Sequence, residues 1–378
     1  MKIENDKNVY ILGAGFSAIR GMPCIPNFML RLRDAHPWLV NQKREREAAA
    51  VERVIEYRLQ SAAAAYRIPI DLENIEELFS LADAGKDVLS RDIRVAIAAT
   101  LDFATETQLE PTTAFTWTEE AQPPALPANW KRRNQKPLQC TAPTYEFFIQ
   151  SLLGGWHGSH AKAAFITFNY DCLVERALMG LNVPFRYGFG VDGNGADGTA
   201  SGTAKSRDSS VWVLKLHGSV NWMRPKVGSR ILKVASSYTE VRSAEGVPEL
   251  VPPTWRKLFA RELVEIWKIA LEELKSATRI VILGFSMPET DLHFKYLLAA
   301  GLRENVSLRE IVFVDKNPGP LEARARKLFG PDMERQPGVR VIGTGIGQFI
   351  GAGQINDGVF SIGRGIPIAV QGVQHSRW

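Results

Sequence analysis

Three polar side chains directly follow apolar runs that predict buried strands. Asn169 and Asp171 come after residues 163–168, and His217 comes after residues 211–216. A histidine in this position is the best candidate for a base near neutral pH. An amide can orient a water or a hydroxyl, and a carboxylate can face a centre that develops positive charge. We therefore take Asn169, Asp171 and His217 as the candidate catalytic residues.

Each of these residues also has a structural interpretation. Asparagine is a favoured N-cap, so Asn169 could cap a helix that starts at Tyr170. Asp171 would then be an acid in the first turn, where it complements the helix dipole. His217 could be a core histidine with satisfied hydrogen bonds. Both interpretations remain open for each residue.

The carboxyl ends of five predicted strands carry glycine or polar motifs. Ligands in open α/β sheets bind at this edge, near the point where the strand order reverses. We therefore expect the five motifs to share one ligand. The motifs are Gly13-Ala14-Gly15-Phe16-Ser17, Thr167-Phe168-Asn169-Tyr170-Asp171, Lys215-Leu216-His217-Gly218-Ser219, Gly284-Phe285-Ser286 and Asp315-Lys316-Asn317.

The first motif is a glycine-rich turn between a strand and a helix. Gly13 and Gly15 lack a Cβ atom, so backbone amides there could approach a pyrophosphate. The alternative is a tight turn with no ligand. A dinucleotide dehydrogenase would add an acid roughly twenty residues later, at the end of a second strand. Asp34 has about this spacing, but residues 31–36 do not read as a strand end. This argues against hydride transfer.

Strands that alternate with helices predict an α/β fold with a mostly parallel sheet. Between the first strand and the second lies a block rich in Ala, Glu, Arg and Leu, which predicts helices over 43–66, 72–84 and 88–105. Residues 106–142 are rich in Pro and Thr and predict an irregular segment. We expect a core of residues 1–40 and 143–345, an insertion over 41–142, and a Gly-rich tail over 346–378.

The composition is that of an ordinary globular protein. The chain has 378 residues, a formal net charge of +5 and three cysteines with no CxxC pair. No spacing suits a structural zinc, so we expect no bound metal. No apolar stretch reads as a signal peptide or a membrane span, so we expect a cytoplasmic protein without a membrane partner. The mild basic excess does not predict nucleic acid as the main substrate.

Taken together, the motifs resemble those of sirtuins. The first motif followed by Gly21-Met22-Pro23 resembles the sirtuin glycine-rich segment, and Thr167–Asp171 looks like the sirtuin TQN(I/L)D motif. Residues 215–219 are similar to its histidine-glycine-serine element, and the order along the chain is the same. A further resemblance is to the sirtuin-like domains of prokaryotic antiphage defence. It rests on Thr167–Asp171, on Lys215–Ser219 followed by Trp222, on Val251–Thr254 and on Gly284–Asp291. The fold that the resemblance implies is a Rossmann core with an inserted helical module and without the sirtuin zinc ribbon.

The resemblance implies hydrolysis of NAD, with NAD as substrate, in an effector that depletes the cell of this cofactor. The missing zinc ribbon argues against a protein deacylase, which stays an alternative, as does a module that senses NAD or ADP-ribose without turnover. We expect a homo-oligomer and an activating partner such as a separately encoded ATPase. The expected cofactor-binding residues are Gly13, Ala14, Gly15, Ser17, Pro23, Thr167, Gly218, Gly284, Ser286, Asp315 and Asn317.

Overall fold

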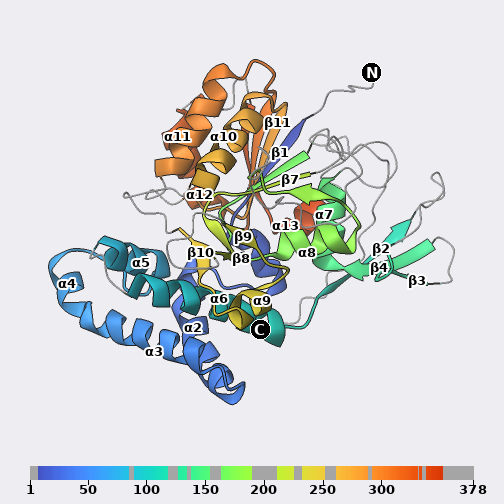
Figure 1. Cartoon of the computed structure of the whole chain (residues 1–378). Helices are drawn as coiled ribbons and strands as arrows, with labels where there is room; N and C mark the ends of the chain where they lie inside the picture. The colour runs from blue at the N-terminus through green and yellow to red at the C-terminus, as the bar shows by residue number, and fades with distance from the viewer. Residues whose placement is uncertain are drawn as a thin grey trace.

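A parallel sheet with seven strands in the described residues lies at the centre of the protein (Figure 1). The structure is a computed structural model that describes residues 7–84, 89–117, 127–133, 138–153, 163–189, 211–224, 232–251, 261–287, 292–330, 332–333 and 338–351. The strand order is β13-β12-β11-β1-β5-β7-β6. The strands are β1 (Asn8–Leu12), β5 (Ala163–Thr167), β6 (Phe185–Arg186), β7 (Val211–Lys215), β11 (Arg279–Leu283), β12 (Glu310–Asp315) and β13 (Gly338–Gly343). The predicted α/β fold is confirmed, whereas β6 and β13 were not predicted.

The central strand is β1, and the later strands extend the sheet on both of its sides. Its neighbours are β5 on one side and β11 on the other. The run Val9 to Leu12 is almost completely buried, as expected for a strand covered on both faces. The strand order thus reverses at β1, which places the expected ligand site beside the end of this strand.

The register of the sheet aligns the strand ends. Leu12 pairs with Thr167 on one side and with Leu283 on the other. Thr167 in turn pairs with Lys215, and Leu283 pairs with Val314. All five motifs therefore leave the sheet at the same level, which is the arrangement that a shared ligand requires.

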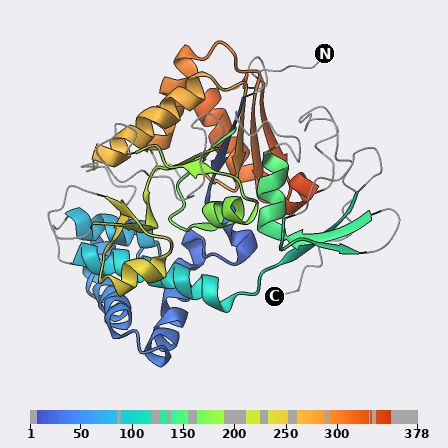
Figure 2. The same ribbon diagram turned by 45° about the vertical axis from the view of Figure 1, so that its right-hand side comes forward.

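Helices cover both faces of this sheet. In Figures 1 and 2, α10 and α11 lie on one side and α7 and α13 lie on the other. The first turn after β1 is α1 (Ala14–Ser17), continued by the 3-10 helix η1 (Ala18–Arg20). The remaining helices of the core are α7 (Thr144–Leu152), α8 (Leu173–Gly180), α10 (Arg261–Lys275), α11 (Leu292–Glu304), α12 (Pro318–Phe329) and α13 (Ile346–Gly351).

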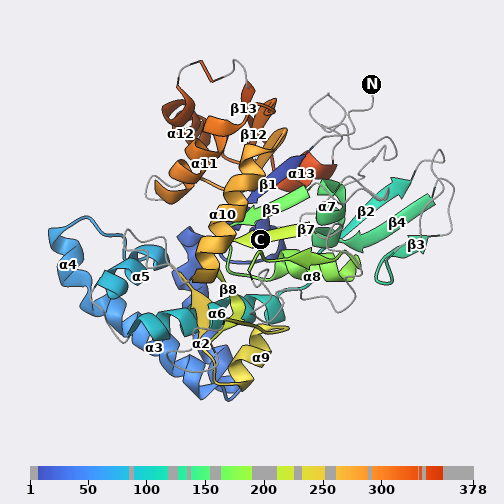
Figure 3. The ribbon, with the colours of Figure 1, turned by 45° about the horizontal axis from the view of Figure 1, so that its top comes forward.

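A separate group of helices packs below the carboxyl edge of the sheet (Figure 3). Its members are α2 (Ile25–Asn41), α3 (Glu45–Gln60), α4 (Ala62–Arg67), α5 (Ile75–Ala84) and α6 (Leu89–Thr107). We call α2 to α6 the helical unit. The predicted helices are present, and α2 packs against α3, α5 and α6. The helical unit therefore begins at Ile25, whereas the sequence analysis places the insertion at 41–142.

Two small antiparallel sheets complete the described structure. Strands β2 (Thr112–Trp117), β3 (Lys131–Arg133) and β4 (Leu138–Pro143) pair in the order β2-β4-β3. The expectation of an irregular segment over 106–142 is therefore wrong for these residues. Pairing between the strands satisfies their backbone N–H and C=O groups, and the Pro-rich composition did not predict this pairing. The second sheet has the order β10-β8-β9, from β8 (Gly218–Met223), β9 (Lys233–Val234) and β10 (Pro248–Leu250). The short helix α9 (Tyr238–Ser243) packs on β8. Of the expected tail, residues 352–378 lie outside the described residues.

Candidate functional site

The five strand ends meet at one cavity of about 540 Å³. Such a volume lies within the roughly 300–1,000 Å³ that is usual for small-molecule sites. Eleven of the fourteen predicted site residues line it. They are Ala14, Gly15, Ser17, Pro23, Asn169, Asp171, His217, Gly284, Ser286, Asp315 and Asn317.

The glycine turns after β1 and β11 touch each other through their backbones. A Cβ atom on Gly13 would lie 2.5 Å from the carbonyl oxygen of Gly284. Gly284 has φ +60°, and a Cβ atom there would lie 2.5 Å from the backbone nitrogen of Phe16. The amide of Gly15 donates a 2.9 Å hydrogen bond to the Gly284 carbonyl. These glycines are required because no side chain fits between the two turns.

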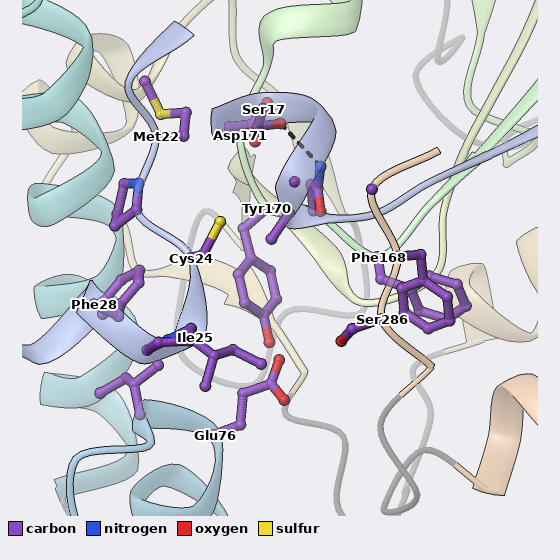
Figure 4. A pocket seen from close by; sticks show the side chains of 18 of the residues that line it. Ser17, Met22, Cys24, Ile25, Phe28, Glu76, Phe168, Tyr170, Asp171 and Ser286 are labelled. Carbon is purple, nitrogen blue, oxygen red and sulfur yellow. Dashed lines mark hydrogen bonds between the residues drawn. The ribbon is translucent and has the colours of Figure 1, made fainter. Parts of the chain in front are cut away.

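The end of β5 is fixed to the end of β1 by polar side chains. The Thr167 hydroxyl donates to the carbonyl of Leu12 at 3.0 Å and accepts the backbone N–H of Asn169 at 3.0 Å. The side-chain nitrogen of Asn169 donates to the Gly13 carbonyl and to the Ser17 hydroxyl, both at 2.9 Å. Figure 4 draws the bond that ends on Ser17 as a dashed line. Both amide protons of Asn169 are thereby used, so its oxygen Oδ1 is the atom left to accept a bond from a ligand or a water.

The start of helix α8 bears on the interpretations of Asn169 as a helix cap and of Asp171 as an acid in the first turn. Helix α8 begins at Leu173, later than predicted, and Asn169 does not cap it. The carboxylate of Asp171 accepts the backbone N–H of Leu173 at 3.0 Å, so Asp171 does serve the start of the helix. Its side chain also lines the cavity. Asp171 therefore binds the backbone at the start of α8 and also lies at the cavity wall.

His217 lies at the end of β7 with 2 % of its surface exposed. Its ring lies 5.1 Å from the ring of Phe168, edge to face, and 6.3 Å from the ring of Tyr170. The backbone carbonyl of His217 accepts the N–H of Val251, which fixes the chain next to the ring. The imidazole is therefore held in an aromatic surrounding while it lines the cavity.

The ends of β11 and β12 form another part of the cavity wall. The Asp315 carboxylate accepts the backbone N–H of Asn317 at 2.8 Å, which shapes the turn into α12. The guanidinium of Arg324 donates to the carbonyl of Ser286. Lys316 and Arg324 also line the cavity, so two cations accompany the predicted polar groups there. The sequence analysis quoted Lys316 within its motif but did not select it, and no motif signalled Arg324.

Three predicted site residues do not line the cavity. Gly13 and Thr167 hold the strand ends from behind, through the bonds to Asn169. Gly218 has φ +86°, and a Cβ atom there would lie 2.0 Å from the carbonyl oxygen of Glu249 in β10. Gly218 therefore serves the close pairing of β8 with β10.

The helical unit supplies the remaining wall, which the sequence analysis did not predict in detail. Figure 4 shows Ile25, Phe28 and Glu76 on this side, opposite Phe168 and Ser286, with Tyr170 between them. The contributing residues are Ile25, Pro26 and Phe28 of α2, Ile75, Glu76 and Phe79 of α5, and Ile97 and Leu101 of α6. An apolar helix face gives the same sequence signal whether it covers a core or a ligand cavity, so no pattern could have identified it.

Cys24 is the nucleophilic side chain of this wall. It precedes α2, and its backbone N–H donates to the side chain of Asn27 at 2.8 Å. Burial raises the pKa of the Cys24 thiol, while the charge of Lys316 lowers it in part and that of Asp315 raises it. The thiol therefore stays protonated at neutral pH.

Two classes of feature were sought and not found in the described part of the chain. It contains no group of three or more His, Cys, Asp or Glu side chains arranged to hold a metal ion. None of its helices is both long enough and apolar enough to cross a membrane.

Comparison with known proteins gives one family match. Residues 163–342 match the family model of the SIR2-like domain, and no curated protein matches the sequence. The structure of Sir2 in complex with the inhibitor EX-527, 2′-O-acetyl-ADP-ribose and a deacetylated p53 peptide is 13% identical, at a TM-score of 0.39, over 93% of this chain and 94% of the other. A Sir2 homologue in complex with NAD is 14% identical, at a TM-score of 0.42, over 92% of this chain and 87% of the other.

Proposed function

We propose that the cavity binds NAD and that the protein hydrolyses it to nicotinamide and ADP-ribose. The match of residues 163–342 to the model of the SIR2-like domain supports this proposal. One observation carries the proposal: the polar ends of β1, β5, β7, β11 and β12 all meet a single cavity. The edge of a doubly wound sheet beside its central strand is where such folds bind nucleotides.

The reaction breaks the bond between the nicotinamide nitrogen and C1′ of the ribose. The electron pair of this bond stays on the nicotinamide, which leaves as a neutral base, and positive charge develops on the ribose. Water then adds to C1′ and loses a proton. The protein must orient the ribose, stabilise the developing cation and position the water.

The candidate catalytic residues suit these three tasks. The oxygen Oδ1 of Asn169 can accept a hydrogen bond from the attacking water or from a ribose hydroxyl, because the amide is held by Gly13 and Ser17. The carboxylate of Asp171 adds negative charge near the developing cation. His217 can accept the proton of the water or of a ribose hydroxyl.

The two ends of NAD have complementary surroundings in this cavity. One side offers polar and cationic groups for the adenosine and the phosphates. The polar side chains are Ser286 and Asn317, and the cations are Lys316 and Arg324. On the other side, Phe28 and neighbouring apolar residues of the helical unit would face the nicotinamide. We place the nicotinamide next to Asn169, Asp171 and His217, where the bond must break.

We further propose that the enzyme is a regulated effector of antiphage defence, located in the cytoplasm and activated by self-assembly or by a separate partner such as an ATPase. An unregulated NAD hydrolase would drain a shared cofactor. The helical unit supports this part of the proposal, because α2, α5 and α6 form a wall of the cavity. A shift of this wall would open or close access, a common way to gate an active site.

The test is to incubate the purified protein with NAD and to measure free nicotinamide and ADP-ribose by chromatography. Release from NAD alone supports the hydrolase. Release that requires an acyl-lysine peptide identifies a deacylase, and saturable NAD binding without release identifies a sensor. Turnover is measured together with light scattering over a range of protein concentrations, with and without candidate partners. A strictly monomeric protein that works at full rate and responds to no partner contradicts the regulatory part.

A further inference from the structure

A completely buried ion pair lies directly behind the candidate catalytic turn. Lys215, the last residue of β7, has 0% of its surface exposed, and Glu175 of α8 has 3%. The Lys215 ammonium nitrogen lies 2.9 Å from the Glu175 carboxylate oxygen Oε1. Burial lowers the pKa of Lys215. The charge of Glu175, smaller contributions from Cys172 and Asp171, and the hydrogen bond to Glu175 together more than offset this effect, so the pKa is raised and the lysine stays charged.

The ammonium group also binds the backbone of the catalytic turn. It donates to the carbonyl of Asp171, and a longer contact of 3.4 Å reaches the carbonyl of Tyr170. With Glu175 as the third acceptor, its three N–H groups have three partners. These carbonyls belong to the segment that carries Asn169 and Asp171 into the cavity.

A buried hydrogen-bond network supports the pair from the other side. The Tyr187 hydroxyl donates to Glu175 at 3.2 Å, and the side chain of Asn221 contacts that hydroxyl at 3.4 Å. Asn221 is also bonded to Ser219 at 2.6 Å, next to the cavity-lining His217. The network therefore joins the turn after β5 to the chain after β7, and these are the two segments that carry the candidate catalytic residues.

Buried ion pairs contribute little net stability, because removing two charges from water offsets their attraction. Apolar residues of similar size often fill such sites equally well. An apolar side chain, however, cannot donate hydrogen bonds to the carbonyls of Tyr170 and Asp171. The Tyr170 carbonyl also accepts the backbone N–H of Val220 at 3.0 Å, so the main contribution of the ammonium to the turn is its hydrogen bond to the Asp171 carbonyl. What this pair specifically provides is therefore the position of the Asp171 end of the turn.

We propose that Lys215 is a positioning residue for NAD cleavage: it holds the Tyr170–Asp171 backbone so that the side chains of Asn169 and Asp171 keep their places in the cavity. This inference rests on the proposed function. Lys215 lines no part of the cavity and is not a catalytic residue; it acts through the turn.

The experiment compares two variants that differ in the amino group of Lys215. Glu175→Gln alone keeps this amino group. Without the charge of Glu175, burial favours the neutral amine, whose two N–H groups can still bind the carbonyls of Asp171 and Tyr170. The amide oxygen that the substitution introduces can still accept from Tyr187. The double variant Lys215→Met/Glu175→Gln also removes the amino group, and it leaves no buried charge unpaired. We expect Glu175→Gln to keep kcat within about threefold. We expect the double variant to lose about thirtyfold or more in kcat with KM changed by less than about threefold, the pattern for lost transition-state positioning.

Amide hydrogen exchange provides a readout that needs no turnover. Exchange in the peptide 168–175 should become at least about tenfold faster in the double variant and stay near wild type in Glu175→Gln, with the central strands β1 and β11 unchanged in both. A matched control is Arg279→Met/Glu310→Leu, which removes an ion pair at the opposite end of the same sheet. This control should affect neither kcat nor exchange in 168–175.

The outcomes separate the two proposals. A folded double variant with wild-type kcat and wild-type exchange in 168–175 overturns the positioning role. A double variant that does not fold also overturns it, because the pair then serves the whole fold. If the wild-type protein cleaves no NAD but the exchange result is as expected, the proposed function fails while Lys215 still orders the turn.

Discussion

The side chains of Asn169 and Ser17 are joined by a hydrogen bond of 2.9 Å, although 152 positions separate them in the sequence. Ser17 follows the central strand β1, and Asn169 follows its neighbour β5. The bond thus connects two of the five strand ends at the cavity. Because it fixes the amide, it also decides which atom of Asn169 can meet a ligand.

We predict that Asn169→Ala reduces kcat for NAD cleavage by about a hundredfold or more, the usual scale for a positioned catalytic group. The variant also loses two hydrogen bonds and should be less stable by about 1–2 kcal/mol. Asn305→Ala is the control, because the Asn305 side chain also donates two hydrogen bonds, to the carbonyls of Leu274 and Ala277, away from the cavity. Its oxygen also accepts the N–H groups of Ser307 and Leu308, so the control should lose at least as much stability and keep its activity. Equal turnover in the two variants would remove Asn169 from the mechanism.

We predict that His217→Gln lowers kcat/KM by about a hundredfold or more, because an amide cannot accept a proton in the way an imidazole does. Glutamine retains much of the side-chain volume beside Phe168. His293→Ala is the control: His293 lies against Trp267 and does not line the cavity. Steady-state kinetics with NAD checks both variants. A folded His217→Gln protein with normal turnover would show that the histidine only fills space.

We predict that Gly284→Ala destabilises the protein by more than about 2 kcal/mol and weakens NAD binding. Its φ of +60° strains any other residue, and the added Cβ would overlap the backbone of Gly15 and Phe16. Gly319→Ala is the control, since a Cβ there meets nothing within 4 Å. Its stability should change by less than about 0.5 kcal/mol. Denaturant unfolding and NAD titration measure the two effects, and equal stability of the two variants would contradict the close packing of the turns.

We predict that iodoacetamide labels Cys24 slowly at pH 7 and faster as the pH rises above 9. Burial raises the pKa of this thiol, so the reactive thiolate forms only in alkaline solution. Because Cys24 lines the cavity, saturating NAD should slow the labelling. Cys172 is the internal comparison: burial raises the pKa of its thiol to about 12, and it should stay unlabelled in folded protein. Mass spectrometry of tryptic peptides distinguishes the sites, and labelling of Cys24 that NAD does not affect would place the ligand elsewhere.

We predict that NAD cleavage does not depend on a metal ion. The chemistry needs no Lewis acid, since nicotinamide leaves as a neutral base, and the cysteine spacing suits no zinc site. Activity should therefore survive dialysis against a chelator. One zinc per chain by elemental analysis after dialysis, with activity that returns only on adding zinc, would refute this prediction.

The sequence by itself determined the parallel sheet and the polar motifs at its edge. Apolar runs such as Val9 to Leu12 are local signals, and the strands that precede Gly13, Phe168 and Gly284 can be recognised without knowledge of their pairing partners. The position of the motifs after these strands was enough to suggest one shared ligand. The helices of the helical unit could also be predicted from the sequence, because helical periodicity is a local signal as well.

Only the tertiary structure decided how these pieces meet. In the folded chain, α2, α5 and α6 lie over the strand ends. The amide of Asn169 donates to Ser17, and the carboxylate of Asp171 binds the backbone at the start of α8. Lys215 is paired with Glu175, although neither residue forms a motif with the other in sequence. Such contacts join positions far apart in the chain, and their formation depends on the packing of whole elements. A local sequence pattern therefore identifies the candidate side chains, and the tertiary structure determines which of their atoms face the cavity.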